Sequence, residues 1–199
     1  MARQADRTAQ TRAAILEAAK TLFGAQGFAA TTMDEIAQAS GVAKGAVYHH
    51  FAGKERVFEA VFEAVSMEVA RQVAAASAEA TDVLASMATA TRAYFTLCSE
   101  GPTGQVMLRD GPAVLGWARW REIDAQHFGG DIAKVLHLAM KQGLVPAQPV
   151  EPLARLFLGA VTEAAMACGE AEHPAAAGRA YAEALETLLD GLRARRPAR

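Results

Sequence analysis

The sequence lacks long hydrophobic runs and contains little cysteine. No apolar stretch approaches the roughly 18 to 20 residues that a membrane-spanning helix needs, and the N-terminus "MARQADRTAQTR" has no apolar signal-peptide segment. We therefore expect a cytoplasmic protein without a membrane partner. The two cysteines, Cys98 and Cys168, are far apart and fit no metal-ligand spacing. Each is interpreted as a small hydrophobic residue in a reducing compartment, and a redox role is left open.

Catalytic signatures are also missing from the sequence. It contains no recognisable set of nucleophile and base, no glycine-rich phosphate loop and no cluster of metal ligands. Lone serine, histidine and aspartate residues are weak signals, so a helical enzyme is only an alternative interpretation. No cofactor and no metal site are expected.

Charge is distributed unevenly along the 199 residues. The net charge of −2 by itself argues against a nucleic-acid partner. Residues 1–56, however, contain seven Lys/Arg and five Asp/Glu, whereas residues 57–199 contain thirteen and seventeen. A mildly basic N-terminal part therefore precedes an acidic remainder.

Helical periodicity is present almost everywhere. Ile15, Ala19 and Phe23 fall on one helix face, and Phe58 and Phe62 on another, while no alternating strand pattern competes with them. Because 52% of the residues are hydrophobic, a sizeable core can form. The predicted fold class is all-α.

Glycine and proline mark the expected boundaries between helices. A first helix is expected to end at Gly24 or Gly27, and further breaks are expected at "DGP" (110–112) and "GG" (129–130). The segment after Gly53 continues directly into a long helix. No flexible linker is therefore expected between the N-terminal part and the remainder.

The stretch "TTMDEIAQASGVAKGAVYHHF" predicts two short helices joined by a sharp turn. The side chain of Thr32 can accept the amide of Glu35 while the Glu35 carboxylate reaches back, which forms a capping box. Gly41 supplies the positive φ that the turn requires, and together with Ala37 it should let the helices cross closely. These features predict a helix-turn-helix, whose second helix can enter a major groove about 12 Å wide.

The second helix of this motif has one apolar and one polar face. Val47 and Phe51 lie four residues apart and are predicted to pack into the core. The polar face can donate hydrogen bonds to guanine or phosphate and contact thymine methyl groups. Its DNA-binding candidates, with the start of the next helix, are Lys44, Gly45, Tyr48, His49, His50 and Lys54. A capped surface helix with partly buried aromatic residues is the structural alternative.

The segment "TTMDEIAQASGVAKGAVYHHFAGKERVFEAV", preceded by "RAAILEAAKTLFGAQGF", resembles the DNA-binding region of TetR-family transcriptional regulators over about residues 8–65. The resemblance implies an N-terminal three-helix domain with the helix-turn-helix and a larger helical ligand-binding and dimerisation domain. We place these at residues 1–53 and 54–199. It also implies that Thr32 contacts DNA. Ala43 stands where many relatives have a serine or threonine that caps the recognition helix and meets phosphate, so that contact is expected to be missing.

Two helices near the C-terminus carry more apolar surface than a small domain readily buries. Small residues at their spacing permit close approach of helices, which suits a four-helix dimer interface with two helices from each subunit. The predicted interface residues are Leu153, Leu156, Phe157, Ala160, Val161, Ala164, Tyr181, Leu185, Leu188, Leu189 and Leu192. The alternative is that both helices only close the core of a single chain.

The middle of the chain is rich in adaptable and aromatic side chains. Such residues, mixed with a few polar groups, are typical of a mostly apolar pocket, although each of them can equally be part of the core. The predicted ligand-binding residues are Met87, Arg92, Tyr94, Phe95, Met107, Arg109, Trp117, Trp120 and His127.

Together these features predict a DNA-binding transcriptional regulator, most simply a repressor released from a palindromic operator by a small, largely apolar ligand. Its expected partners are double-stranded operator DNA, a small-molecule effector and a second copy of the chain. An architectural protein that binds DNA regardless of sequence is the other alternative, but it would not need so large an acidic, aromatic-containing remainder. The operator, the effector and the sign of regulation stay open.

Overall fold

Every regular element in residues 2–99 and 101–193, the part of the chain that the computed structural model describes, is a helix. The predicted all-α fold class is therefore confirmed. The described residues form two compact units, one from residues 2–65 and 101–120 and the other from residues 66–99 and 121–193. Neither the first nor the second unit is a single continuous segment.

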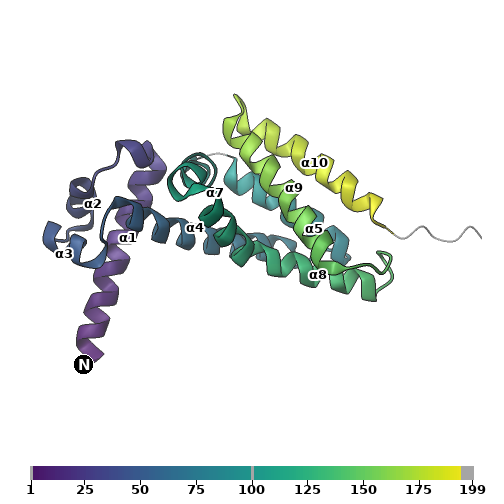
Figure 1. Cartoon of the computed structure of the whole chain (residues 1–199), viewed down its shortest axis with the longest axis horizontal. Coiled ribbons are helices and arrows are strands. Elements are labelled where there is room, and N and C mark those ends of the chain that lie inside the picture. The colour runs from purple at the N-terminus through teal and green to yellow at the C-terminus, as the bar shows by residue number, and fades with distance from the viewer. Residues whose placement is uncertain (1, 100, 194–199) are drawn as a thin grey trace, which may run out of the picture. The chain divides into compact units, whose positions relative to one another are not determined.

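The first unit is built around the N-terminal helices. Phe23, Phe58 and Phe62 are fully buried in it, and the ring of Phe23 meets that of Phe58 edge-on at 5.2 Å. Its elements are α1 (Ala2–Ala30), α2 (Met33–Ser40), α3 (Lys44–His50), the first part of α4 (Lys54–Ser77), α6 (Gly101–Gly104), the π-helix η1 (Gln105–Asp110) and most of α7 (Gly111–Asp124) (Figure 1). The predicted three-helix N-terminal region with a helix-turn-helix is present.

Helix α1 does not end at its first glycine as expected. Helix α1 continues past Gly24. An ideal Cβ on Gly24 would lie 2.4 Å from the Cβ of Pro102, so the missing side chain lets α6 pack closely against α1 at this point. The chain bends at Gly27, whose φ of 79° and ψ of 168° are outside the helical region. There the amide of Phe28 donates a 2.8 Å hydrogen bond to Asp110 Oδ2. The end of α1 is thus fastened to a segment that lies 82 residues later in the chain.

A second tie within the first unit joins α7 to α4. The guanidinium of Arg119 donates to Glu59 Oε1 and to Glu63 Oε1, each at 2.7 Å. These two carboxylates lie one helical turn apart on α4, so a single planar cation can hold both. The contact with Arg119 is also the main reason that the pKa of Glu59 is lowered.

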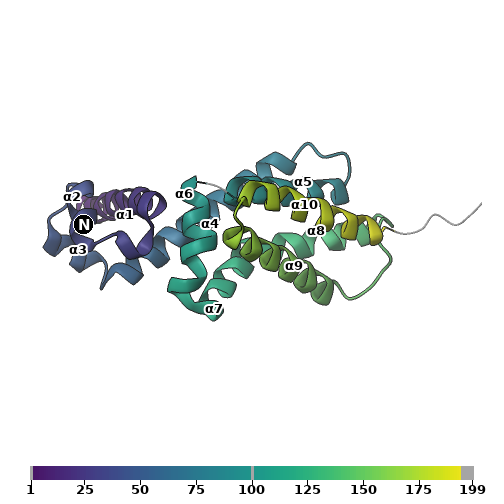
Figure 2. The ribbon, with the colours of Figure 1, turned by 90° about the horizontal axis from the view of Figure 1, so that it is seen from above.

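The second unit is a helical bundle. Helix α10 packs against α5 and α9, and α8 packs against the same two helices. Figures 1 and 2 both show α9 and α10 side by side. The elements are the second part of α4, α5 (Val83–Cys98), the π-helix η2 (Ala125–Gly129), α8 (Gly130–Lys141), α9 (Val150–Glu170) and α10 (Pro174–Gly191).

Two of the expected boundaries join a π-helix to an α-helix without an interruption of the helical path. At the "GG" pair, Gly129 and Gly130 have helical φ values of −64° and −66°, and η2 leads directly into α8. Gly111 at the "DGP" sequence is also helical, and α7 begins there. The predicted boundaries therefore coincide with the ends of elements, but the chain does not leave the helical region there, because these glycines have helical φ and ψ values. The real irregularity of α7 is at Gly116, with a φ of 74°.

Helix α4 runs without interruption from Lys54 to Ser77. This agrees with the expectation that no flexible linker follows Gly53. The functional division at residue 53 stays a prediction. Within the described ranges, no helix combines the length and the apolar character needed to cross a membrane.

Candidate nucleic-acid interface and internal pocket

Helix α2 begins with the predicted capping box. The amide of Glu35 donates to Thr32 Oγ1 at 3.2 Å, and the amide of Thr32 donates to Glu35 Oε2 at 2.7 Å. The hydrogen bonds from Thr32 lower the pKa of the Glu35 carboxyl. Two amides that helix geometry leaves without partners are therefore satisfied, and the start of the motif is fixed by local contacts.

The turn between α2 and α3 depends on Gly41. This residue has a φ of 67°, its amide donates to the carbonyl of Gln38, and the next amide, from Val42, donates to the carbonyl of Ala37. The pair of hydrogen bonds is a Schellman motif. A Cβ on Gly41 would meet nothing within 4 Å. Its backbone conformation, rather than the expected close crossing of helices, is the reason for glycine here.

Helix α3 has the two faces that the sequence predicts. Val47 and Phe51, the residue that ends the helix, are buried. The opposite face is open, and the side chains offered to solvent include Lys44, Tyr48 and His49, with Tyr48 48% exposed. A Cβ on Gly45 would meet nothing within 4 Å, and His50 is half-buried.

The N-terminal end of α3 carries no side-chain cap. Ala43 occupies the cap position and makes no such hydrogen bond, and the expected loss of a phosphate contact stays a prediction. The ammonium of Lys44 instead pairs with Asp34 at 2.7 Å, and both side chains are more than half exposed. Exposed ion pairs contribute little stability. Lys44 can therefore exchange Asp34 for another anion with little loss of folding free energy.

Lys54 occupies a different environment from the other candidates. Its ammonium donates to the carbonyls of Phe28 and Thr31 at 2.7 and 2.8 Å and lies 4.2 Å from the centroid of the Phe28 ring. These carbonyls lie at the end of α1, where a cation is favoured by the helix dipole. Lys54 therefore links the start of α4 to the end of α1, and this structural role does not depend on any contact with DNA.

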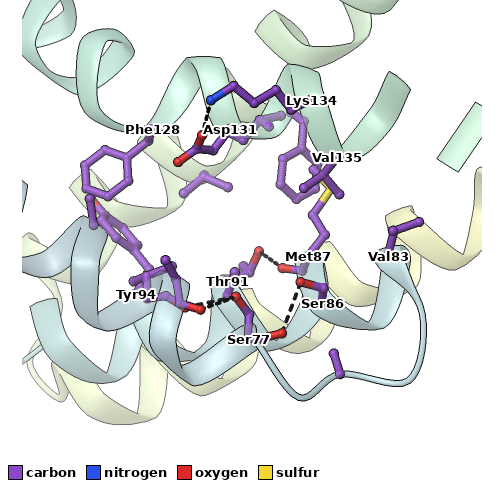
Figure 3. A pocket seen from close by; sticks show the side chains of 18 of the residues that line it. Ser77, Val83, Ser86, Met87, Thr91, Tyr94, Phe128, Asp131, Lys134 and Val135 are labelled. Carbon is purple, nitrogen blue, oxygen red and sulfur yellow. Dashed lines mark hydrogen bonds and ion pairs between the residues drawn. The ribbon is translucent and has the colours of Figure 1, made fainter. Parts of the chain in front are cut away.

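The second unit contains a pocket of about 690 Å³ between α4, α5, η2, α8 and α9. Figure 3 shows Phe128, Lys134 and Val135 on one side of it and Met87 and Tyr94 on the other. A volume of several hundred Å³ is typical of sites for small organic molecules. Most of the lining side chains are apolar: Ala70, Val73, Ala74, Ala78, Ala80, Val83, Met87, Ala90, Phe128, Ile132, Val135, Phe157, Leu158 and Val161.

Three of the predicted ligand-binding residues line this pocket, namely Met87, Tyr94 and His127. The tryptophans lie in the first unit instead, where Trp117 is 57% exposed and Trp120 is 2% exposed. The remaining predicted residues do not line the pocket either: Arg92 pairs with Glu186, Phe95 is buried beside Tyr94, Met107 is buried in η1 and Arg109 is exposed there.

A polar cluster that includes one residue of the pocket wall, Asp124, was not predicted from the sequence. Asp124 is 7% exposed, and its Oδ2 accepts a 3.0 Å hydrogen bond from the hydroxyl of Thr162. That hydroxyl accepts in turn from Arg121 at 2.7 Å, while the guanidinium of Arg121 lies 3.9 Å from Asp124 Oδ2. Burial raises the pKa of the Asp124 carboxyl, and these two neighbours only partly oppose the shift. Burial likewise raises the pKa of the nearby Tyr94 hydroxyl.

Helices α9 and α10 have apolar side chains on two faces. Leu156, Tyr181 and Leu188 are 72%, 38% and 61% exposed. The other predicted interface residues are buried or half-buried within the chain: Leu153, Phe157, Ala160, Val161, Ala164, Leu185, Leu189 and Leu192. The predicted set therefore combines the core-facing stripe of each helix with a stripe that no described part of the chain covers fully.

Two family models match the chain. Residues 15–61 match the model described as bacterial regulatory proteins of the tetR family, and residues 84–192 match a tetracyclin repressor-like C-terminal domain. The first match contains the helix-turn-helix, and the second contains more than half of the chain. Proteins of this family regulate transcription and are not enzymes.

Individual relatives agree with these matches. A TetR-family transcriptional regulator from Pectobacterium atrosepticum is 31% identical, with a TM-score of 0.87, over 96% of this chain and 97% of its own. The regulator AcrR of Shigella flexneri is 48% identical over 59 residues, and the repressor KstR2 of Mycobacterium tuberculosis is 39% identical over 59 residues. The alignment with AcrR covers 29% of this chain and 27% of AcrR, and the alignment with KstR2 covers 30% of each protein. The full-length structural match and the two family models together place this chain in the TetR family of transcriptional regulators.

Proposed function

We propose that this protein is a dimeric repressor that binds a palindromic operator through α3 and releases it when a small, largely apolar ligand enters the pocket of the second unit. The observation that carries the proposal is the open face of α3 on a turn held by the capping box and Gly41. Among the partly matching relatives, KstR2 is named a repressor, which favours that sign of regulation. Because the matching family model describes bacterial regulatory proteins and bacterial operator DNA lies in the cytoplasm, we propose the cytoplasm as its location.

The proposed DNA contacts lie on α3 and around it. Lys44 would exchange the exposed carboxylate of Asp34 for guanine or a phosphate, and the Tyr48 ring would contact thymine methyl groups. Gly45 would allow close approach of the backbone. The remaining proposed contacts are Thr32, His49, His50 and Lys54. Lys54 would combine any phosphate contact with its hydrogen bonds to α1.

The proposed dimer uses the outward faces of α9 and α10. Leu156 and Leu188 are large apolar side chains left mostly in solvent, and a second copy related by a two-fold axis would cover them with the same surface. Two recognition helices would then face successive major grooves, roughly 34–36 Å apart on the DNA.

Helix α4 is the proposed connection between ligand and DNA. It begins four residues after His50, the last residue of α3, and its later residues Ala70 and Val73 line the pocket. A ligand that favours one position of α4 would therefore alter how α3 is presented to the DNA. In a dimer, a small change in each recognition helix is enough to weaken binding at a fixed half-site spacing.

The DNA-binding proposal is tested by selecting binding sites from random duplex DNA and measuring affinity for the selected site. Tyr48→Ala and Lys44→Ala should each weaken specific binding by about 1–3 kcal/mol, because each removes a proposed contact with a base edge. Lys141→Ala removes an exposed cation from α8 and serves as the matched control.

Selection that yields no preferred sequence would support the architectural alternative. Wild-type affinity for both α3 variants, measured at several salt concentrations, would remove α3 as the reading surface.

A further inference from the structure

The pocket wall presents more negative than positive charge. Its charged residues are Asp82, Asp124 and Asp131 against one lysine, Lys134. Each of the three aspartates has a cation within 4 Å: Asp131 pairs with Lys134 at 2.9 Å, Asp82 lies 3.6 Å from Arg193 while it caps α5, and Asp124 lies 3.9 Å from Arg121. Asp131 and Asp82 lie at the more solvent-exposed part of the wall.

Asp124 differs from the other two aspartates in its burial and in its partners. It is 7% exposed, and the nearest cation, Arg121, stands 3.9 Å away with a nitrogen that is directed to the Thr162 hydroxyl. A buried carboxylate needs a close, well-oriented cation or several hydrogen bonds to remain ionised at low cost. A second positive charge that approaches from the pocket should therefore be attracted to the Asp124 carboxylate.

The apolar part of the pocket is compatible with a cation as well. Tyr94 and Phe128 meet edge-on with ring centroids 5.4 Å apart, and both line the pocket. The faces of aromatic rings attract cations, in particular where water is excluded. Met87 and Leu158 provide polarisable and aliphatic contact for an uncharged body.

We propose that the effector of this protein is an apolar molecule with a protonated amine, whose ammonium group pairs with Asp124 while its body packs against Met87, Tyr94 and Phe128. This inference rests on the proposed function, since it names the chemical class that the pocket takes. A fatty-acid anion would instead meet the like charge of the Asp124 carboxylate, and a neutral alcohol would gain no charge pairing.

Three ligands test the inference, namely decylamine, decanol and decanoate. They share a ten-carbon chain and differ in the charge of the head group. Titration calorimetry on the full chain without DNA should give decylamine at least about tenfold tighter binding than either of the others, as expected for one added buried ion pair. Asp124→Asn keeps an oxygen for Thr162 and should remove this preference, while affinity for decanol changes by less than about twofold. The decanol affinity also reports that the variant is folded.

Two further variants separate charge from shape. Asp124→Glu keeps the charge and should keep the amine preference. Asp131→Asn removes a pocket carboxylate that already pairs with Lys134, and it should leave decylamine binding nearly unchanged. Equal affinity for the three probes, failure of decylamine to bind, or tighter binding of decanoate would overturn the inference. None of these measurements involves DNA, so their outcome does not test the proposed operator binding, which the DNA-selection experiment tests separately.

Discussion

Leu188 provides the sharpest test of the proposed dimer, because its replacement should not disturb the single chain. It is 61% exposed on α10, whereas its neighbour Leu189 is 2% exposed and belongs to the core. Leu188→Asp therefore leaves the core intact and places a carboxylate in the proposed seam. Assembly and folding can be measured separately in the same variant.

The expected effect follows from the exposed area. Complete burial of a leucine side chain stabilises by roughly 1.5–3 kcal/mol, so covering the 61% exposed part of Leu188 is worth about 1–2 kcal/mol. A two-fold interface contains this residue twice, which gives about 2–4 kcal/mol per dimer, or roughly 30- to 700-fold in Kd. The aspartate adds the cost of a carboxylate without a partner, so a loss of at least about 100-fold is expected.

Sedimentation equilibrium over a wide concentration range measures this loss, and circular dichroism verifies that the variant stays helical. Leu138→Asp is the matched control, since Leu138 is 43% exposed on α8 and lies outside the proposed interface. An unchanged dimer constant for Leu188→Asp would refute the assignment. If Leu138→Asp alone dissociated the protein, the interface would lie on α8.

Two further predictions concern the stability of the first unit, both measured by chemical denaturation. Gly27→Ala should destabilise by about 2–4 kcal/mol, because its backbone is in a region that only glycine adopts readily and the new Cβ would lie 3.1 Å from Gln105 Nε2. Gly45→Ala, in open helical space, should be neutral or stabilising, and equal losses for both would contradict the argument. Lys54→Met should destabilise by about 1.5–3 kcal/mol through loss of two charged hydrogen bonds. Lys141→Met, at an exposed position, should not change the stability. If Lys54→Met were as stable as the wild type, DNA contact would be left as the main role of Lys54.

The parts of the fold that the sequence predicted depend on contacts between near neighbours. The capping box uses two residues three positions apart, and the Schellman turn needs one residue with a positive φ. Val47 follows from the helical period. Such features are visible in a single sequence because the chain between the partners is too short to permit many other arrangements.

Only three of the predicted ligand-binding residues, Met87, Tyr94 and His127, line the pocket, because its lining is set by tertiary contacts. Asp124 and Thr162 are 38 residues apart and come from different helices, so no local pattern links them. The tryptophans were placed in the pocket because of their residue type, which does not say which unit they join. On α10, Leu188 and Leu189 are adjacent and chemically identical, and only the packing of the helix against α5 and α9 separates the exposed one from the buried one.

The hydrogen bond from the Phe28 amide to Asp110 has a consequence for building hybrid regulators. A common plan is to exchange the N-terminal region of one regulator for that of another at a single junction. Here such an exchange at residue 65 would separate α1 from the segment 101–120 that completes its unit, and α1 would meet a foreign residue in place of Asp110. A hybrid that preserves how this protein holds its recognition helix needs two exchanged segments, with α6, η1 and the start of α7 transferred together with the first 65 residues.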